Sequence, residues 1–132
     1  MSEAQLTPNL RAGGDINPYR VVICSTSADN TGIEANATDA FPLGIADGST
    51  KQFDSTLHAE SGDPISLQTG LVMIAEAGEA ITRGSKVATG ATGKLEAADA
   101  AAAGDYNVGV ALESASGDGA LIRIYYMPHA NY

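Results

Sequence analysis

Cysteine, tryptophan and basic residues are scarce in this chain of 132 residues, and each scarcity excludes a class of protein. Cys24 is the only cysteine, so no internal disulfide can form, and its place at the end of the apolar run 21–24 predicts a buried thiol rather than a nucleophile. Seven basic residues stand against sixteen acidic ones, and the resulting net charge of −9 repels phosphate backbones and anionic lipid heads. We therefore expect neither nucleic acid nor a membrane as a partner.

Long hydrophobic runs are missing too. The first fifteen residues have no basic region followed by an apolar one, so they do not form a signal peptide. No apolar run approaches the length that spans a bilayer. The sequence thus predicts synthesis in the cytoplasm.

The residue types that perform catalysis or bind metal are few and poorly spaced. His58 and His129 are the only histidines, and neither has a cysteine or another histidine at ligand spacing. The serines lack the Gly-x-Ser-x-Gly pattern, and the glycine-rich segment 89–94 lacks the spacing of a phosphate loop. We expect no enzyme activity, no catalytic residue, no metal and no cofactor.

Apolar residues are plentiful at 44%, but they are mostly small, with only two phenylalanines. A core of small side chains buries little area per residue, and hydrophobic stabilisation scales with that area. We therefore expect a protein that gains stability from a partner or from copies of itself.

Short apolar segments bounded by glycine-containing turns predict an all-β fold, either a small barrel or a sandwich. The strands are expected within 19–25, 64–76, 85–89, 106–114 and 119–127, the last of them ending at Pro128. The alanine-rich segment 96–105 favours either a structured loop or one short helix near 96–104.

An internal repeat organises the chain. Phe41, Gly44 and Ala46 recur 65 positions later as Tyr106, Gly109 and Ala111. A glycine inside a strand marks a bulge or a bend, so its recurrence predicts corresponding bends in two β units. The expected organisation is an extended arm at 1–14, one β domain at 15–128 with pseudo-repeats at about 14–74 and 78–127, and a tail at 129–132.

One alternative comes from the segment 80–97. Its Ile-x-x-Gly-x-x-Val rhythm resembles the turn of biotinyl and lipoyl carrier domains, which also have two similar halves. The lysine of that segment, Lys94, lacks the flanking residues of a carrier lysine. A carrier or adaptor module therefore remains the alternative of a different class.

The order of motifs in the second half resembles the head-decoration, or capsid cement, proteins of tailed bacteriophages. The similarity runs through "ITRGSKVATGATGKLEA", "YNVGVALESA" and "GALIRIYYMP", covers about 62–128 well, and extends loosely to "GDINPYRVV" and "PLGIAD". It implies a β-rich structural protein without catalytic residues. Such a protein sits on the outside of the phage head, bridges subunits of the major capsid protein, and is made in the bacterial host cytoplasm. A minor tail-associated or fibre-associated β domain is a further alternative.

The resemblance also implies self-association, with a homotrimer favoured over a homodimer. Tyrosine is enriched in interfaces because it buries area while it keeps a polar tip, and an extended arm can pair with a neighbour's sheet edge. We therefore expect the contacts with the capsid or with other subunits to lie in the arm and on the tyrosine-bearing edge, with ordinary edge-strand packing as the alternative for the tyrosines. The expected contact residues are Leu6, Pro8, Leu10, Arg11, Tyr125, Tyr126 and Tyr132.

Overall fold

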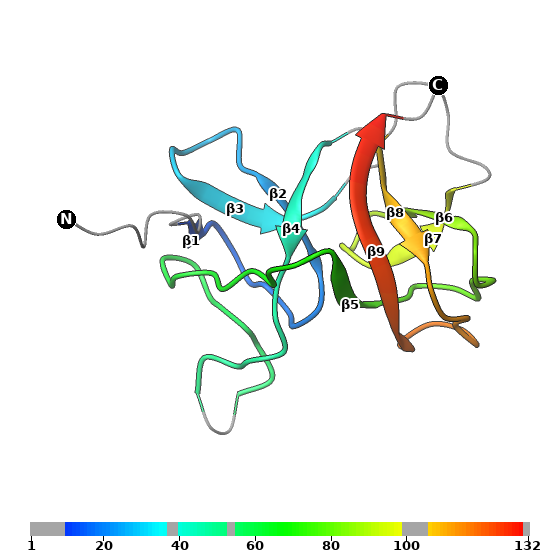
Figure 1. Cartoon of the computed structure of the whole chain (residues 1–132). Helices are drawn as coiled ribbons and strands as arrows, with labels where there is room; N and C mark the ends of the chain where they lie inside the picture. Colours follow the sequence, from blue (N-terminus) through cyan, green and yellow to red (C-terminus); the bar gives the residue numbers. More distant parts are fainter. Residues whose placement is uncertain (1–9, 37–39, 53–54, 99–105, 131–132) are drawn as a thin grey trace.

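The computed structural model of the chain describes residues 10–36, 40–52, 55–98 and 106–130 (Figure 1). Regular structure in these ranges consists of nine β-strands, and the predicted all-β fold is confirmed. The strands are β1 (Arg11–Ala12), β2 (Val21–Cys24), β3 (Thr31–Glu34), β4 (Pro42–Ile45), β5 (Val72–Glu76), β6 (Lys86–Thr89), β7 (Leu95–Ala97), β8 (Tyr106–Ala111) and β9 (Leu121–Ala130).

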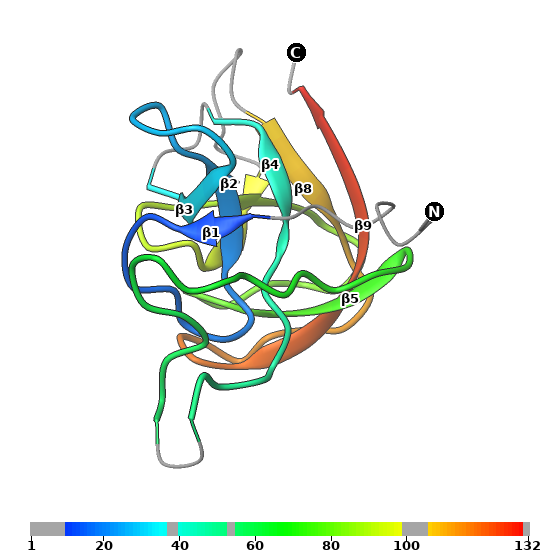
Figure 2. The ribbon, with the colours of Figure 1, turned by 90° about the vertical axis from the view of Figure 1, so that its left-hand side faces the viewer.

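The strands form two sheets that pack against each other (Figures 1 and 2). The first sheet has the order β1-β3-β2-β4, and the second has the order β5-β9-β8-β6-β7. Within the described residues the sheets do not join into one closed cylinder, so of the two predicted architectures the structure is a sandwich. Almost all neighbours are antiparallel, which fits the short connections and glycine-containing turns of the sequence.

The strand β9 is longer than predicted. The sequence predicts its end before Pro128, because proline cannot donate a ladder hydrogen bond. The structure continues it to Ala130, and the register with β8 shifts between Asn107 and Gly109, opposite Pro128. A proline is tolerated at such an irregularity because its missing N–H costs no ladder hydrogen bond there.

The predicted segment 64–76 is divided rather than continuous. Leu67 makes a single bridge to Ala46, Gly70 turns the chain with a φ of +97°, and only Val72–Glu76 form β5. The interruption lets this segment begin against the first sheet and end in the second.

The region of the predicted helix is only partly described. Glu96 and Ala97 belong to β7, and residues 99–105 lie outside the described residues. Arg11 and Ala12, at the end of the predicted arm, form β1 beside β3. At the other end, His129 of the predicted tail belongs to β9.

The two halves of the chain form equivalent strand pairs. β2 pairs with β4 through Val22 opposite Gly44, and β6 pairs with β8 through Val87 opposite Gly109. In both pairs the register shifts immediately after the valine, which places a bulge or irregularity at the same position in each half. The boundaries of the two units, and the division into arm, domain and tail, stay predictions.

Aromatic residues at equivalent positions meet between the halves. The rings of Phe41 and Tyr106 lie 5.2 Å apart at an interplanar angle of 89°, which is an edge-to-face contact. The larger core cluster also draws on both halves, since Val21 and Ile45 pack there with Val87 and Ile124. The halves therefore share one core.

The single cysteine is a correction to the sequence analysis. Cys24 was expected to be buried, but its side chain is exposed at the end of β2. The three preceding residues are all buried, so the apolar run predicted burial for its last member as well. Cys24 still pairs with Gly32 of β3, but the pairing of β2 with β4 ends at Ile23, so Cys24 stands at the border of the sheet.

Candidate functional site

Three of the predicted contact residues, Leu6, Pro8 and Tyr132, lie outside the described residues. The other four are placed in two different sheets. Leu10 and Arg11 lie at the border of the first sheet, whereas Tyr125 and Tyr126 lie on β9 of the second. The structure therefore gives these residues no common site within one sheet.

Leu10 and Arg11 are held by contacts within the chain. The Leu10 carbonyl accepts the Ile65 amide at 3.0 Å, and its side chain packs against the smaller core cluster. The exposed Arg11 guanidinium donates to the Gly62 carbonyl at 3.0 Å. These contacts anchor the chain where the described residues begin.

The two tyrosines of β9 have different surroundings. Tyr125 is 37% exposed and lies opposite Val72 of β5. Tyr126 points the other way, and its hydroxyl donates to the Pro42 carbonyl at 3.1 Å. Burial raises the pKa of Tyr126 to about 12. Of these two tyrosines, Tyr125 therefore has the exposed ring, while Tyr126 fastens the two sheets together.

Large apolar side chains are exposed on and near the second sheet. The exposed positions along β9 are Leu121, Arg123, Tyr125 and Met127. On a sheet face that contacts water, such outward positions are usually polar, whereas here only Arg123 is charged. The exposed large hydrophobic residues are Phe41, Leu43, Leu71, Val72, Leu112, Leu121, Tyr125 and Met127. Exposed apolar surface of this kind is typical of a protein interface.

The sequence pattern predicts only one member of this set as a contact residue, Tyr125. The signal for two others, Leu121 and Met127, is present in 121–127, whose outward-facing positions are apolar with a single exception. Phe41 and Leu43 could not be recognised in the same way, because their stretch was interpreted as a buried core strand.

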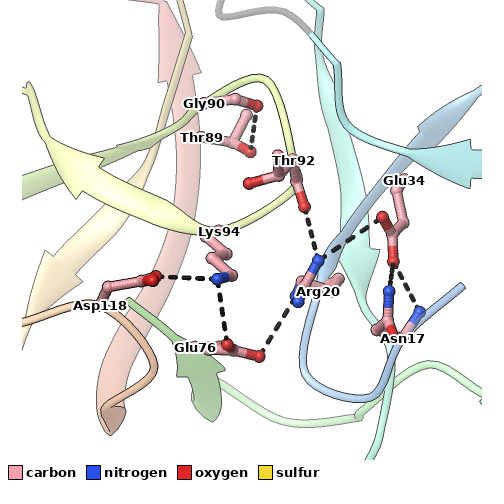
Figure 3. A network of polar contacts seen from close by, with 9 residues as sticks. All are labelled: Asn17, Arg20, Glu34, Glu76, Thr89, Gly90, Thr92, Lys94 and Asp118. Atoms are coloured by element: carbon pink, nitrogen blue, oxygen red, sulfur yellow. Dashed lines mark hydrogen bonds and ion pairs between the residues drawn. The ribbon is translucent and has the colours of Figure 1, made fainter. Parts of the chain in front are cut away.

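The most extensive polar cluster joins the two halves of the chain (Figure 3). The Arg20 guanidinium lies between two carboxylates, 3.6 Å from Glu34 and 3.2 Å from Glu76, and also donates to the Thr92 carbonyl at 3.0 Å. The other oxygen of Glu76 lies 3.5 Å from the Lys94 ammonium. Glu76 of β5 thus connects the Arg20 end of the first sheet to the turn before β7.

Both ends of this polar cluster are closed by further hydrogen bonds. Glu34 accepts the amide and the side-chain nitrogen of Asn17 at 2.6 and 2.9 Å. Lys94 donates to Asp118 at 2.8 Å, and this bond raises the pKa of the lysine and lowers the pKa of the carboxyl. Each charged group of this cluster therefore pairs with a group of opposite charge, and the pairs link the two halves of the chain.

This environment of Lys94 bears on the carrier alternative. A carrier lysine is presented at a hairpin tip for modification, but the Lys94 side chain is 22% exposed and its ammonium pairs with two carboxylates. The residue that the alternative requires is thus engaged within the fold.

His58 forms a second polar cluster, beneath the loop that follows β4. Its Nε2 accepts the Ser66 amide at 3.0 Å, so Nδ1 carries the proton and donates to the Ser49 carbonyl at 2.8 Å. Asp47 lies 3.5 Å from the same nitrogen. Both ring nitrogens are therefore used to hold the loop against the chain that follows it.

Within the part of the chain that the structure describes, no three side chains of His, Cys, Asp or Glu come together in a group that could hold a metal ion. The same residues contain no helix that is long and apolar enough to cross a membrane.

Comparisons with known proteins identify the family. The chain is similar to the crystal structure of the head fiber gp8.5 N base of bacteriophage phi29, with a TM-score of 0.68 and 22% sequence identity over 90% of this chain and 91% of that chain. At this identity the likeness shows the fold alone. No curated protein matches the chain. The sequence profile of the phage cement proteins matches residues 3–126, nearly the whole length, so the chain belongs to the phage cement protein family and is a structural protein of the virion.

Proposed function

We propose that this protein binds the outer surface of the phage head, bridges neighbouring subunits of the major capsid protein, and thereby stabilises the shell. The family match over residues 3–126 is the observation that carries the proposal. The proposed role is structural and requires no catalytic residue.

The surface of the second sheet supports the proposal. Val72, Tyr125 and Met127 are 52%, 37% and 47% exposed, and Val72 lies directly opposite Tyr125. Aromatic and methionine side chains are enriched in interfaces, and covering them removes apolar area from water. We propose this face as the contact with the shell, with Tyr125 as the member that the sequence also indicated.

Self-association is the second part of the proposal. A light core gains stability when copies cover each other's apolar surface, and a homotrimer is favoured over a homodimer. The net charge of −9 opposes close packing of copies unless apolar contacts or a basic shell surface offset it. Sedimentation analysis of the purified protein measures the oligomeric state directly.

The proposed function is tested on expanded heads that lack the protein. Purified protein should bind at micromolar concentration, raise the melting temperature of the heads, and be present in the virion at a copy number close to that of the major capsid protein. Absence of binding would overturn the proposal.

A pair of variants tests the proposed face. Tyr125→Asp places a charge in the apolar face and should weaken head binding by about tenfold or more. Ser61→Asp adds the same charge at an exposed turn of the first sheet and should leave binding unchanged. Equal affinities of the two variants for the heads would show that the contact with the shell lies on another part of the protein.

A fibre-associated role is the second candidate, and the likeness to the phi29 head fiber base favours it. Electron microscopy of particles that carry labelled protein separates the two candidates. Label over the whole shell supports the cement role, whereas label only at fibre attachment points supports the second candidate.

A further inference from the structure

The two equivalent strands β4 and β8 differ in how many neighbours they have. β8 lies between β6 and β9, whereas β4 is the last strand of its sheet and pairs only with β2. Figure 1 shows β4 at the border of the first sheet, facing β5 and β9 of the second. The first half of the molecule therefore lacks the strand that β9 provides in the second half.

The segment that follows the loop after β4 first runs beside β4, as β9 runs beside β8, and then turns away. Ala46 bridges to Leu67, as Ala111 pairs with Ile124 in the second half. The next contact is repeated as well, since Asp47 donates to the Ser66 carbonyl at 2.9 Å and Leu112 donates to the Arg123 carbonyl at 2.9 Å.

Beyond Gln68 the two halves diverge. The backbone N–H of Gln68 donates to the Ile45 carbonyl at 2.9 Å, and the turn at Gly70 then directs the chain into β5. In the second half, β9 continues instead beside β8 and pairs as far as Ala130 opposite Tyr106. Among the described residues, no strand pairs with Leu43 on the side away from β2. The adjacent Pro42 has no N–H, and its carbonyl accepts the Tyr126 hydroxyl at 3.1 Å.

The two equivalent glycines record the same difference. A Cβ built on Gly109 would collide with the backbone carbonyl of Tyr125, because β9 lies directly against it. A Cβ built on Gly44 would meet only the Leu67 side chain, at 3.0 Å from Cδ1. Backbone occupies this space in the second half, and a movable side chain occupies it in the first.

A groove follows the free edge of β4. It has a volume of about 250 Å³ and is lined by Leu43, Gly44, Ile65, Ser66, Leu67, Gln68, Thr69 and Met73, none of which is charged. Leu43 is 39% exposed, whereas Val108, at the equivalent bulge position, is fully buried. An apolar side chain is thus left uncovered where the second half covers its counterpart.

We propose that the free edge of β4, at Leu43, accepts an extended, uncharged apolar segment of the shell protein as an added strand. Strand addition takes affinity from main-chain hydrogen bonds and specificity from side-chain pockets, and the groove beside Leu43 supplies such a pocket. This inference rests on the proposed function, because it adds a second contact with the shell to the proposed face of the second sheet.

The strands β5 and β9 of a second copy are poor candidates for the occupant. β9 is paired on both sides, and the outer edge of β5 is closed where Ile74 bonds the Gln68 side chain and Glu76 bonds the Tyr19 carbonyl. The net charge of −9 also disfavours a second acidic chain in an uncharged groove. A segment from a different chain fits both observations.

Crosslinking on reconstituted heads tests the proposal. The variant Leu43→Cys in a Cys24→Ser background carries a photoreactive label in the groove, and Ser61→Cys in the same background is the control at an exposed turn. Illumination should join the Leu43 position to the major capsid protein and leave the control without that adduct. Hydrogen exchange at Leu43–Ile45 should slow by about tenfold or more on binding to heads.

The other outcomes overturn the inference in distinguishable ways. An adduct between two copies of this chain would make the groove a self-association site. Faster exchange at Leu43–Ile45 in free protein that lacks residues 2–9 would mean that the arm of the chain fills the groove. Head binding without an adduct at position 43 would reject the groove and leave the proposed function intact, whereas absence of head binding by the unmodified protein would reject both.

Discussion

At the scale of single residues, two glycines at equivalent positions have different physical reasons to be glycine. Gly109 is required because the β9 backbone occupies the space of its Cβ, whereas Gly44 faces only the Leu67 side chain. The sequence repeat made them look alike, but the close approach of another backbone exists in only one half.

This difference predicts unequal costs for one substitution. Gly109→Ala should lower the free energy of unfolding by about 2 kcal/mol or more, because the strand pair must separate to accept a methyl group. Gly44→Ala should cost less than about 1 kcal/mol, because the Leu67 side chain can rotate away. Urea unfolding of both variants measures the difference, and equal costs would contradict the structure.

Tyr126 gives a prediction for alkaline pH. Burial favours its neutral form and raises its pKa from 10.0 to about 12, so the associated stability is present below pH 10 and is lost as the pH rises from 10 to 12. Tyrosinate absorbance should show a last titration step near pH 12, which Tyr126→Phe abolishes and Tyr125→Phe retains. A last step that survives Tyr126→Phe would assign it to another tyrosine.

At the scale of elements, one side chain completes the edge of β5. The side-chain oxygen of Gln68 accepts the Ile74 N–H at 3.0 Å, and its side-chain nitrogen donates to the Ile74 carbonyl at 2.7 Å, as the backbone of a neighbouring strand would. It also donates to the Ala46 carbonyl of the first sheet at 3.2 Å. Gln68 therefore closes an edge strand and ties the two sheets together.

Gln68→Glu tests this role with almost no change in shape. A carboxylate can still accept from Ile74 but cannot donate, so two carbonyls lose their donors and the protein should lose about 2 kcal/mol of stability. Gln52→Glu, at an exposed loop position, introduces the same charge and should have little effect. Urea midpoints that are equal for both variants would show that the Gln68 contacts contribute nothing.

At the scale of the whole molecule, the two halves cannot be separated. β5 follows the first half in sequence but pairs in the second sheet, and Arg20 links β3 to β5 through its two carboxylate partners. The core cluster contains residues from both halves. The two similar halves of the chain therefore form one cooperative unit.

We expect one unfolding transition, with coincident curves from circular dichroism and tyrosine fluorescence. Arg20→Ala leaves Glu34 and Glu76 without their shared cation in a place with little solvent, and should lower the stability of the whole molecule by about 3 kcal/mol. Arg83→Ala, at an exposed turn, is the matched control. Two separate transitions, or a loss confined to one sheet, would contradict this account.

Local patterns in the sequence were sufficient for the class of fold, most of the strands, the glycine-marked irregularities and the family resemblance. Apolar alternation and turn residues depend on neighbours along the chain, so they can be recognised from the sequence alone. The end of β9 and the exposure of Cys24 were missed, because both depend on where a strand leaves its sheet.

Tertiary structure alone decided which equivalent positions are covered. The segment after β4 and the segment after β8 begin alike, yet a turn at Gly70 sends the first into the opposite sheet. The free edge of β4, the groove beside Leu43 and the closure of β5 by Gln68 all follow from that one divergence. No local pattern contains it, because the course of a chain after a turn is chosen by contacts with residues far away in the sequence.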